Sequence, residues 1–174
     1  TYINWLNDPA INQYLEVRNS KQTEESVVKY INALRTRPNL EMFAVLTKEE
    51  HRHLGNMTIS AFDNYQMASY GLMLGEQNAW NLGIGAECTA LMLEFLFRYA
   101  NARRVCGMAY AENQRATDNL QRFGFVHEGT FRQAVIKADG GFDDVEIFGM
   151  LKSEWEENRK IVLGILSRAE FKIQ

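Results

Sequence analysis

The sequence predicts one domain of mixed α+β class. Short segments rich in strand-forming residues alternate along the chain with longer segments whose apolar residues recur at helical spacing. The length of 174 residues fits a single domain with one continuous core. We find no internal repeat and no low-complexity segment in the sequence. We therefore expect residues 1–174 to form one domain.

The chain begins with predicted helices. Residues 1–15 have helix-like apolar spacing that is interrupted at Asp8-Pro9, where proline favours the start of a new helix. We therefore expect a pair of short helices there. A longer helix is predicted from Glu24, because residues 20–23 supply capping side chains, and it should end before Pro38.

Strands are predicted next. Three short segments favour an antiparallel meander, because they are rich in strand formers and separated by polar turns: residues 42–46, 55–62 and 68–74. The pattern then predicts a helix at 86–101, a strand at 104–110, a helix at 113–122 and strands at 125–136 and 142–151. The helix from Ala86 is apolar on nearly every side, which indicates burial against the sheet.

A last helix is predicted over residues 158–173. Its apolar residues lie between basic residues, and two interpretations are open. In the first, the helix docks on its own domain. In the second, it forms a contact in a homodimer.

Composition excludes several classes of protein. A net charge of −3 gives no electrostatic reason to expect a nucleic-acid partner. The three His and two Cys do not form a metal-binding pattern. His51-Arg52-His53 lies in a predicted charged turn, and Cys88 and Cys106 are expected to be buried free thiols. Because neither a membrane-length apolar run nor a secretory leader is seen, we expect a cytoplasmic protein without a membrane partner.

A glycine-containing loop, Trp80-Asn81-Leu82-Gly83-Ile84-Gly85, is the most informative feature. It follows the apolar strand that ends at Leu74 and leads directly into the helix from Ala86. A helix N-terminus has unpaired N–H groups and the positive end of the helix dipole, so it suits an anion. Gly83 and Gly85 would let phosphate oxygens approach these N–H groups closely. The loop therefore predicts a site for a diphosphate-bearing ligand.

Two nucleotide-binding motifs do not fit this loop. A Walker loop ends in Gly-Lys-Ser/Thr, whereas this loop ends Gly85-Ala86-Glu87. The third glycine of a dinucleotide fingerprint is also missing. Taken alone, the loop could equally be a turn that only joins a strand to a helix.

A second motif lies downstream of the loop. Asn113 and Ala116 begin a predicted helix that ends in Gly124-Phe125. Together with Trp80-x-x-Gly83-x-Gly85, this Asn-x-x-Ala and Gly-Phe pattern resembles the GNAT superfamily of acyl-CoA N-acyltransferases, and within it the branch of the ribosomal-protein N-acetyltransferases. The resemblance covers about residues 1–155, which leaves 156–174 as a C-terminal helical extension. Members also carry a strand that would precede Thr1.

The resemblance implies a fold and a cosubstrate. The fold would be of GNAT type, with a central, mostly antiparallel, splayed sheet flanked by helices. The cosubstrate would be acetyl-CoA, with no metal. The residues that match the family's acetyl-CoA site are Leu72, Leu74, Asn81, Leu82, Gly83, Ile84, Gly85, Ala86, Asn113 and Ala116.

Two residues of the downstream motif need separate interpretation. Asn113 could contact the cofactor, because its amide both donates and accepts, or it could cap the helix from Gln114. Many family members carry a Tyr seven residues after that Asn, which protonates the leaving thiolate. Here the position is Leu120, so that general acid is absent and water would supply the proton.

The resemblance implies direct attack of an amine on the thioester, and a base must then accept the amine's proton. The candidate bases are Glu76, at the end of the donor strand, and Glu16, in the early helical segment; Glu16 could instead form a surface ion pair with Arg18. Tyr110 is a further catalytic candidate, although packing is the favoured role for both Tyr70 and Tyr110. His127 is expected to be a partly buried structural residue.

The resemblance thus predicts an enzyme that transfers acetyl from acetyl-CoA to a primary amine. The acceptor would be the N-terminus of a protein or a small molecule such as a nucleotide-linked amino sugar. The alternative is a non-catalytic module that binds acyl-CoA as a sensor or scaffold.

Overall fold

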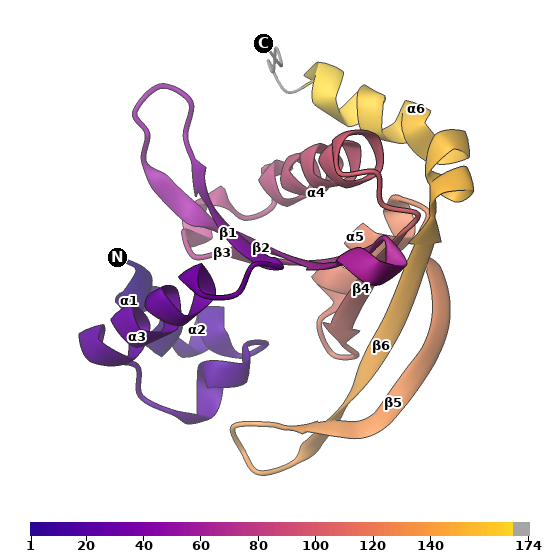
Figure 1. Cartoon of the computed structure of the whole chain (residues 1–174). Helices are drawn as coiled ribbons and strands as arrows, with labels where there is room; N and C mark the ends of the chain where they lie inside the picture. The colour runs from indigo at the N-terminus through magenta and orange to yellow at the C-terminus, as the bar shows by residue number, and fades with distance from the viewer. Residues whose placement is uncertain (169–174) are drawn as a thin grey trace.

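The computed structural model describes residues 1–168, without the side chains of residues 62, 63 and 168. Within this range it contains a six-stranded sheet with the order β1-β2-β3-β4-β6-β5. Figure 1 shows α4 and α6 on one side of β1–β3 and the N-terminal helices on the other. The α+β prediction is therefore confirmed.

The N-terminal helices begin where the sequence predicted. Asp8 caps the second helix, because its side chain accepts from the Ala10 N–H at 2.9 Å. Thr23 and Ser26 form a reciprocal capping box at the start of the third. A 3₁₀ turn between them was not predicted, because one turn is too short to give a periodic pattern. The segments are α1 (Tyr2–Asn7), α2 (Pro9–Asn12), η1 (Glu16–Asn19) and α3 (Glu24–Arg35).

The predicted antiparallel meander is confirmed. It consists of β1 (Leu40–Leu46), β2 (His53–Phe62) and β3 (Met67–Leu74), with a 3₁₀ turn η2 (Asp63–Tyr65) before β3. One prediction was wrong in part: His53 is the first residue of β2, not a turn residue. Its ring packs edge-on against the Trp5 ring, with 4.8 Å between the ring centres. Such a contact between distant residues has no local sequence signal.

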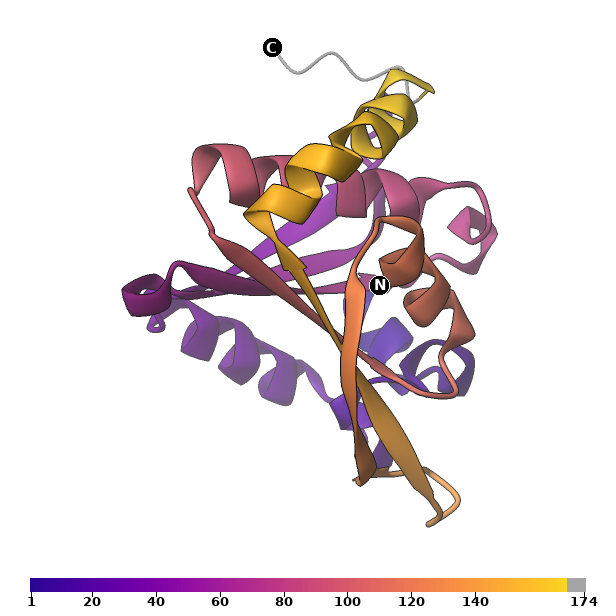
Figure 2. The same cartoon turned by 90° about the vertical axis from the view of Figure 1, so that its right-hand side faces the viewer.

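The C-terminal half supplies β4 (Arg104–Tyr110), β5 (Val126–Ile136) and β6 (Phe142–Leu151). In the sheet, β6 lies between β4 and β5 and pairs antiparallel with both. Figure 2 shows that β5 and β6 form a long curved hairpin that extends beyond the helices. Most β5 side chains are exposed, as expected for an edge strand.

The two halves of the sheet meet at the only parallel pair among the described strands, β3 with β4. This pair runs over three residues only, from Met67 opposite Arg104 to Ser69 opposite Cys106. Both strands continue beyond it, β3 to Leu74 and β4 to Tyr110. Since they no longer pair there, the sheet is splayed between them.

The predicted helix from Ala86 starts two residues earlier. It is α4 (Ile84–Glu94), which continues as a π-helical segment η4 (Phe95–Tyr99). Figure 2 shows α5 (Gln114–Arg122) beside β5, on the same side of the sheet as α4. The core between these helices and the sheet includes the fully buried Leu93, Phe97, Val105 and Phe123. Burial of α4 against the sheet is therefore confirmed.

The last helix, α6 (Lys152–Arg168), begins directly after β6 rather than at residue 158. Trp155 lies in the first turns of the helix, where it is buried and stacks on Phe97 with 5.2 Å between the ring centres. Val162 and Leu166 are also buried. The described part of the helix thus docks on its own chain, and residues 169–173 of the predicted helix lie outside the described residues.

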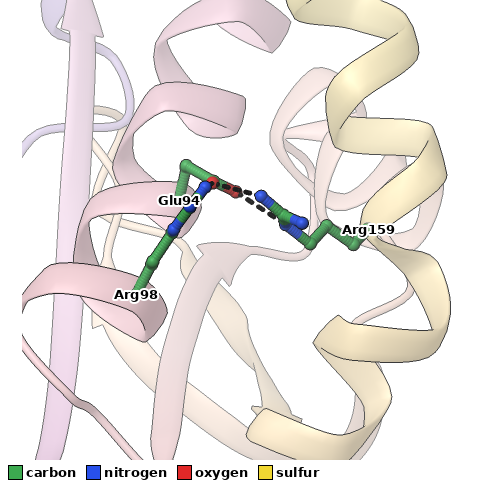
Figure 3. Close-up of polar contacts among 3 residues, drawn as sticks. All are labelled: Glu94, Arg98 and Arg159. Carbon is green, nitrogen blue, oxygen red and sulfur yellow. Dashed lines mark hydrogen bonds and ion pairs between the residues drawn. The ribbon is translucent and has the colours of Figure 1, made fainter.

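An ion-pair cluster fixes α6 to α4 (Figure 3). Glu94 is only 4% exposed, and its carboxylate receives Arg159 Nη2 at 2.7 Å and Arg98 Nη1 at 3.0 Å. Hydrogen bonding from Arg159, helped by Arg98, holds the pKa of the Glu94 carboxyl below its usual range despite burial. Because the folded state favours the ionised form, this carboxylate stabilises the fold above its unfolded pKa, and the effect is lost as pH falls.

We predict that Glu94→Gln lowers the free energy of unfolding by about 1 to 3 kcal/mol at neutral pH, since the two guanidinium groups lose their charged partner. The difference from the unsubstituted protein should shrink as the pH falls through the lowered pKa of the Glu94 carboxyl, where Glu94 itself becomes protonated. Denaturant unfolding at several pH values measures this. Glu157→Gln on the exposed face of α6 is the control and should change little. A pH-independent difference would contradict the assigned charge effect.

Candidate functional site

The glycine-containing loop joins β3 to α4 through a 3₁₀ turn, η3 (Gln77–Ala79). The Trp80 indole N–H donates to the Leu74 carbonyl at 2.9 Å, which ties the loop to the end of β3. Asn81 and Gly83 have φ of 62° and 86°, the left-handed region, and Gly83 is the N-cap of α4. These conformations turn the chain sharply into the helix, and they explain the need for Gly83.

The start of α4 presents backbone N–H groups without acceptors. The first backbone bond into the helix runs from Glu87 N to the Gly83 carbonyl at 3.0 Å. In the described part of the chain, the N–H groups of residues 81–86 have no recorded acceptor. Helix geometry directs those of Ile84, Gly85 and Ala86 out of the N-terminus. Such a set of donors can receive an anion.

The backbone of β3 also presents unpaired groups, towards the splay. Gly75 N donates to the Leu54 carbonyl at 2.9 Å. Together with the register of the pair, this bond determines which residues of β3 direct their N–H groups towards β2. By the alternation of an antiparallel ladder, Met73 and Gly71 face β2, whereas Leu72 and Leu74 turn their N–H groups towards β4. Since β4 has diverged at this level, these N–H groups have no strand partner.

Gly85 lies beside the same stretch of β3. A Cβ at this position would lie 3.7 Å from Leu72 and 3.8 Å from Leu74, which is ordinary van der Waals contact. Packing therefore does not require glycine here, and the backbone is helical. The small residue instead keeps the space between the first turn of α4 and β3 open.

Asn113 is confirmed as a helix cap. Its Oδ1 accepts from the Ala116 N–H at 3.3 Å, and its own N–H donates to the Tyr110 carbonyl at 2.8 Å. Among the described residues, no partner is recorded for the Asn113 side-chain NH₂ group. The cap uses the acceptor of this amide and leaves its donor for a ligand, so a cofactor role is compatible with capping.

Leu120 lies in the core and not in an open site. It is 5% exposed, and a Cβ placed on Gly107 would come within 2.7 Å of its Cδ2 atom. This close approach of α5 to β4 explains Gly107. The leucine at this position has no proton to supply.

A polar cluster lies at the far end of β4. The Tyr110 hydroxyl donates to the Glu16 carboxylate and accepts from Arg18 Nη1 at 2.8 Å. Burial, together with the hydrogen bond to Glu16, raises the pKa of Tyr110 to about 12, so the phenol is protonated at neutral pH. The structure therefore brings together two of the predicted catalytic residues. The predicted surface ion pair of Glu16 with Arg18 is replaced by contacts of both with Tyr110.

Arg18 also ties this cluster to the hairpin. Its Nε donates to the Ile136 carbonyl at the end of β5 at 3.1 Å, and its guanidinium lies 4.9 Å from the centre of the Tyr110 ring. The η1 turn, β4 and β5 are thus held together by one side chain. The sequence gave no signal for this contact, because 118 residues separate Arg18 from Ile136.

Three other candidates lie elsewhere. Glu76 occupies the N-cap position of η3 without a side-chain capping bond, and within residues 1–168 it makes no contact with Glu16 or Tyr110. Tyr70 packs near Phe125, and burial raises the pKa of its hydroxyl to about 12, which agrees with a packing role. The His127 side chain is more exposed than expected, at 46%, because β5 is an edge strand, but it makes structural contacts with Glu146 and Phe148.

The remaining expectations concern thiols, metals and membranes. Cys88 is buried, which raises the pKa of its thiol to about 11, whereas Cys106 is only half-buried and accepts from Arg104 Nε at 3.4 Å. No cluster of His, Cys, Asp or Glu that could hold a metal occurs among the residues that the structure describes. None of the helices in that range is long and apolar enough to cross a membrane.

Comparisons with known proteins agree with this architecture. A family model described as an acetyltransferase (GNAT) domain matches residues 1–126. The uncharacterized N-acetyltransferase p20 of Bacillus licheniformis is 25% identical over 154 residues, which cover 87% of this chain and 85% of that protein. The uncharacterized N-acetyltransferase YnaD of Bacillus subtilis is 23% identical over 76% of each chain.

Solved structures that share the fold include two named N-acetyltransferases. A GCN5-related N-acetyltransferase from Brucella melitensis superimposes with a TM-score of 0.77 at 21% identity, over 98% of this chain and 78% of that one. Spermidine N-acetyltransferase from Vibrio cholerae, in complex with CoA and spermine, gives a TM-score of 0.79 at 17% identity, over 89% and 90% of the chains.

The chain therefore belongs to the GNAT acetyltransferase family, as its motifs predicted. It is an acetyl-CoA-dependent N-acetyltransferase. The match does not separate the ribosomal-protein branch from other branches, so that finer assignment stays a prediction.

The residues of the site fit acetyl-CoA chemically. The N–H groups of residues 81–86 match a pyrophosphate, which needs several donors. The free backbone groups of Leu72 and Leu74, with the Asn113 amide, match the two amides of a pantetheine arm.

We predict opposite effects of alanine at the two loop glycines. Gly83→Ala should cost about 1 to 2 kcal/mol of stability, because alanine is strained at a left-handed φ, and should weaken CoA binding by distorting the loop. Gly85→Ala should be neutral or up to about 1 kcal/mol more stable and should still bind CoA. Thermal unfolding and calorimetric titration with CoA test this pair. Equal affinity losses in both variants would contradict the interpretation.

A second pair separates the two roles of Asn113. Asn113→Asp keeps a capping oxygen but removes the NH₂ donor, so it should raise the Michaelis constant for acetyl-CoA while the melting temperature is retained. Asn113→Ala should lose both the capping oxygen and the NH₂ donor, with a stability cost of about 1 kcal/mol. If the aspartate variant kept the original Michaelis constant, capping would be the whole role of Asn113.

Proposed function

We propose that residues 1–174 form one acetyltransferase domain that acetylates a primary amine on a protein N-terminus or a small molecule by direct attack. The observation that carries this proposal is the splay between β3 and β4, which has different chemistry on its two faces. Unpaired N–H groups of α4 lie on one face, and the cluster of Glu16 with Tyr110 belongs to the other.

The opposite placement follows from strand alternation. On β4, Val105 and Ala109 are buried in the core beneath the helices. Tyr110, one residue on from Ala109, therefore points to the other face, towards the N-terminal helical segments. Leu72 and Leu74 point to the α4 face, where they approach Gly85. The donor and the acceptor can thus enter the splay from different sides.

When bound, acetyl-CoA supplies a thioester whose carbonyl carbon accepts the amine. An unpaired N–H of β3, from Leu72 or Leu74, would donate to the carbonyl oxygen as negative charge develops there. Loss of one such donor costs about 10²- to 10³-fold in rate in a well-studied protease. The N–H groups of residues 81–86 and the Asn113 amide would hold the rest of the cosubstrate.

The amine must lose a proton as its nitrogen bonds to carbon and the carbon–sulfur bond breaks. Glu16 is the base that the structure favours, directly or through a water molecule, because it lies with Tyr110 on the acceptor face. Tyr110, protonated at neutral pH, would orient the Glu16 carboxylate. Glu76 is the second candidate, at the end of the donor strand. With Leu120 in the core, the thiolate would take its proton from water.

The charges of the cluster indicate which kind of amine would fit as the acceptor. Arg18 lies against Tyr110 and follows Glu16 by two residues in the chain, so the cluster contains one cation and one carboxylate. This balance favours a monoamine over a polycation such as the spermine in the Vibrio cholerae structure. A protein N-terminus or an amino sugar is consistent with it.

The direct test of this function is release of free thiol from acetyl-CoA in the presence of an amine panel. The panel contains peptides with free N-termini, nucleotide-linked amino sugars and spermidine. We expect amine-dependent release with a monoamine. Tight CoA binding without release for any amine would favour the non-catalytic acyl-CoA-binding module.

We predict that Glu16→Gln lowers kcat by about 10²- to 10⁴-fold, as for loss of a general base, with little change in CoA affinity. Tyr110→Phe should have a smaller effect, because it removes a group that only orients the carboxylate. Glu76→Gln is the matched control and should keep most activity. Steady-state rates with a confirmed amine measure all three, and loss of activity in Glu76→Gln alone would reverse the assignment of the base.

A further inference from the structure

Arg115 lies beside the glycine-containing loop although it comes from a different helix. It is the second residue of α5, and its guanidinium carbon is 4.8 Å from the centre of the Trp80 ring. This is a cation–π contact, which holds a cation without neutralising it. The contact brings a positive charge to the start of α4.

The Trp80 ring on which Arg115 lies is held in one orientation. Trp80 cannot turn freely, because its indole N–H is bonded to the Leu74 carbonyl at the end of β3. A guanidinium that lies on a ring can keep its planar edge of N–H groups available for other acceptors. Arg115 is exposed, and no carboxylate partner is recorded for it within residues 1–168. Its N–H groups are thus available to a ligand.

The loop itself lacks positive charge. Residues 76–86 contain no Lys or Arg, and the first turn of α4 carries Glu87, which is unfavourable for an anion at this helix end. Burial raises the pKa of the Glu87 carboxyl, which reduces this penalty without replacing a cation. A pyrophosphate carries two negative charges, and the neutral N–H groups of residues 81–86 cannot balance them. Arg115 is the cation that the described contacts place at this loop.

We propose that Arg115, held on the Trp80 ring, binds the pyrophosphate of acetyl-CoA and supplies the positive charge that the loop lacks. This inference rests on the proposed acetyl-CoA site. It gives Trp80 a second purpose besides closing the loop, since the ring positions the guanidinium. Arg115 acts by direct contact with the phosphate oxygens, and Trp80 is a positioning residue.

Calorimetric titration with CoA and with 3′-dephospho-CoA tests the proposal, using the unsubstituted protein, Arg115→Gln and Arg115→Lys. Arg122→Gln is the control, because it removes the same charge from an exposed residue at the other end of α5. We expect Arg115→Gln to weaken both ligands by the same factor, about tenfold or more, as for a charge-assisted hydrogen bond. The affinity of Arg115→Lys should lie between those of Arg115→Gln and the unsubstituted protein, since lysine keeps the charge but cannot stack as a plane on the ring.

Two further readouts separate a contact from a structural role. The affinity of Arg115→Gln should depend less on salt than that of the unsubstituted protein, because one charge–charge interaction is gone. Its melting temperature should be unchanged. Trp80→Leu should reproduce part of the affinity loss.

Each outcome decides the proposal. Equal CoA affinity for Arg115→Gln and the unsubstituted protein would overturn it and leave the acetyl-CoA site itself intact. A loss for CoA but not for 3′-dephospho-CoA would overturn the pyrophosphate assignment in favour of the 3′-phosphate. If the unsubstituted protein did not bind CoA, the proposed function and this inference would both fail.

Discussion

The divergence of β3 from β4 after three residue pairs is the constraint on which the site depends. Were the two strands to pair along their full length, the N–H groups of Leu72 and Leu74 would be consumed by the sheet. Contacts on the core side link the segment around α5 to both β3 and α4. Tyr70 of β3 packs near Phe125, and Thr89 of α4 accepts from the Asn119 amide of α5 at 2.8 Å. Helix α5 and the residue Phe125 after it are thus packed against the same two elements that form the α4 side of the splay.

The two faces of the splay are built on different principles. On the α4 side, the donors are neutral backbone N–H groups at the start of the helix. The left-handed conformation of Gly83 turns the chain so that these groups point outwards. On the other side, Glu16 and Tyr110 are placed by side-chain contacts that Arg18 ties to the hairpin. Behind α4, the bonds of Glu94 with Arg159 join it to α6. The α4 face thus depends on the position of one helix, and the face with Glu16 and Tyr110 depends on contacts between segments distant in sequence.

Local patterns were enough to predict most helices and strands and the position of the glycine-containing loop before α4, because apolar periodicity, capping residues and glycines act on neighbouring residues. Contacts between distant residues gave no such signal. The packing of Arg115 on Trp80 and the pairing of Glu16 with Tyr110 depend on how α5 and η1 lie in the fold. The late prediction for the start of α6 has a similar cause, because the burial of Trp155 in its first turns depends on contact with the distant Phe97.

Amide hydrogen exchange along β3, with and without acetyl-CoA, tests the central claim most directly. If the splay exposes this strand for the cosubstrate, the amides of Leu72 and Leu74 should exchange fast in the free protein and become protected when acetyl-CoA binds. Those of Gly71 and Met73, which face β2, should be protected in both states. Equal protection of all four residues in the free protein, or no change at Leu72 and Leu74 on binding, would contradict the account.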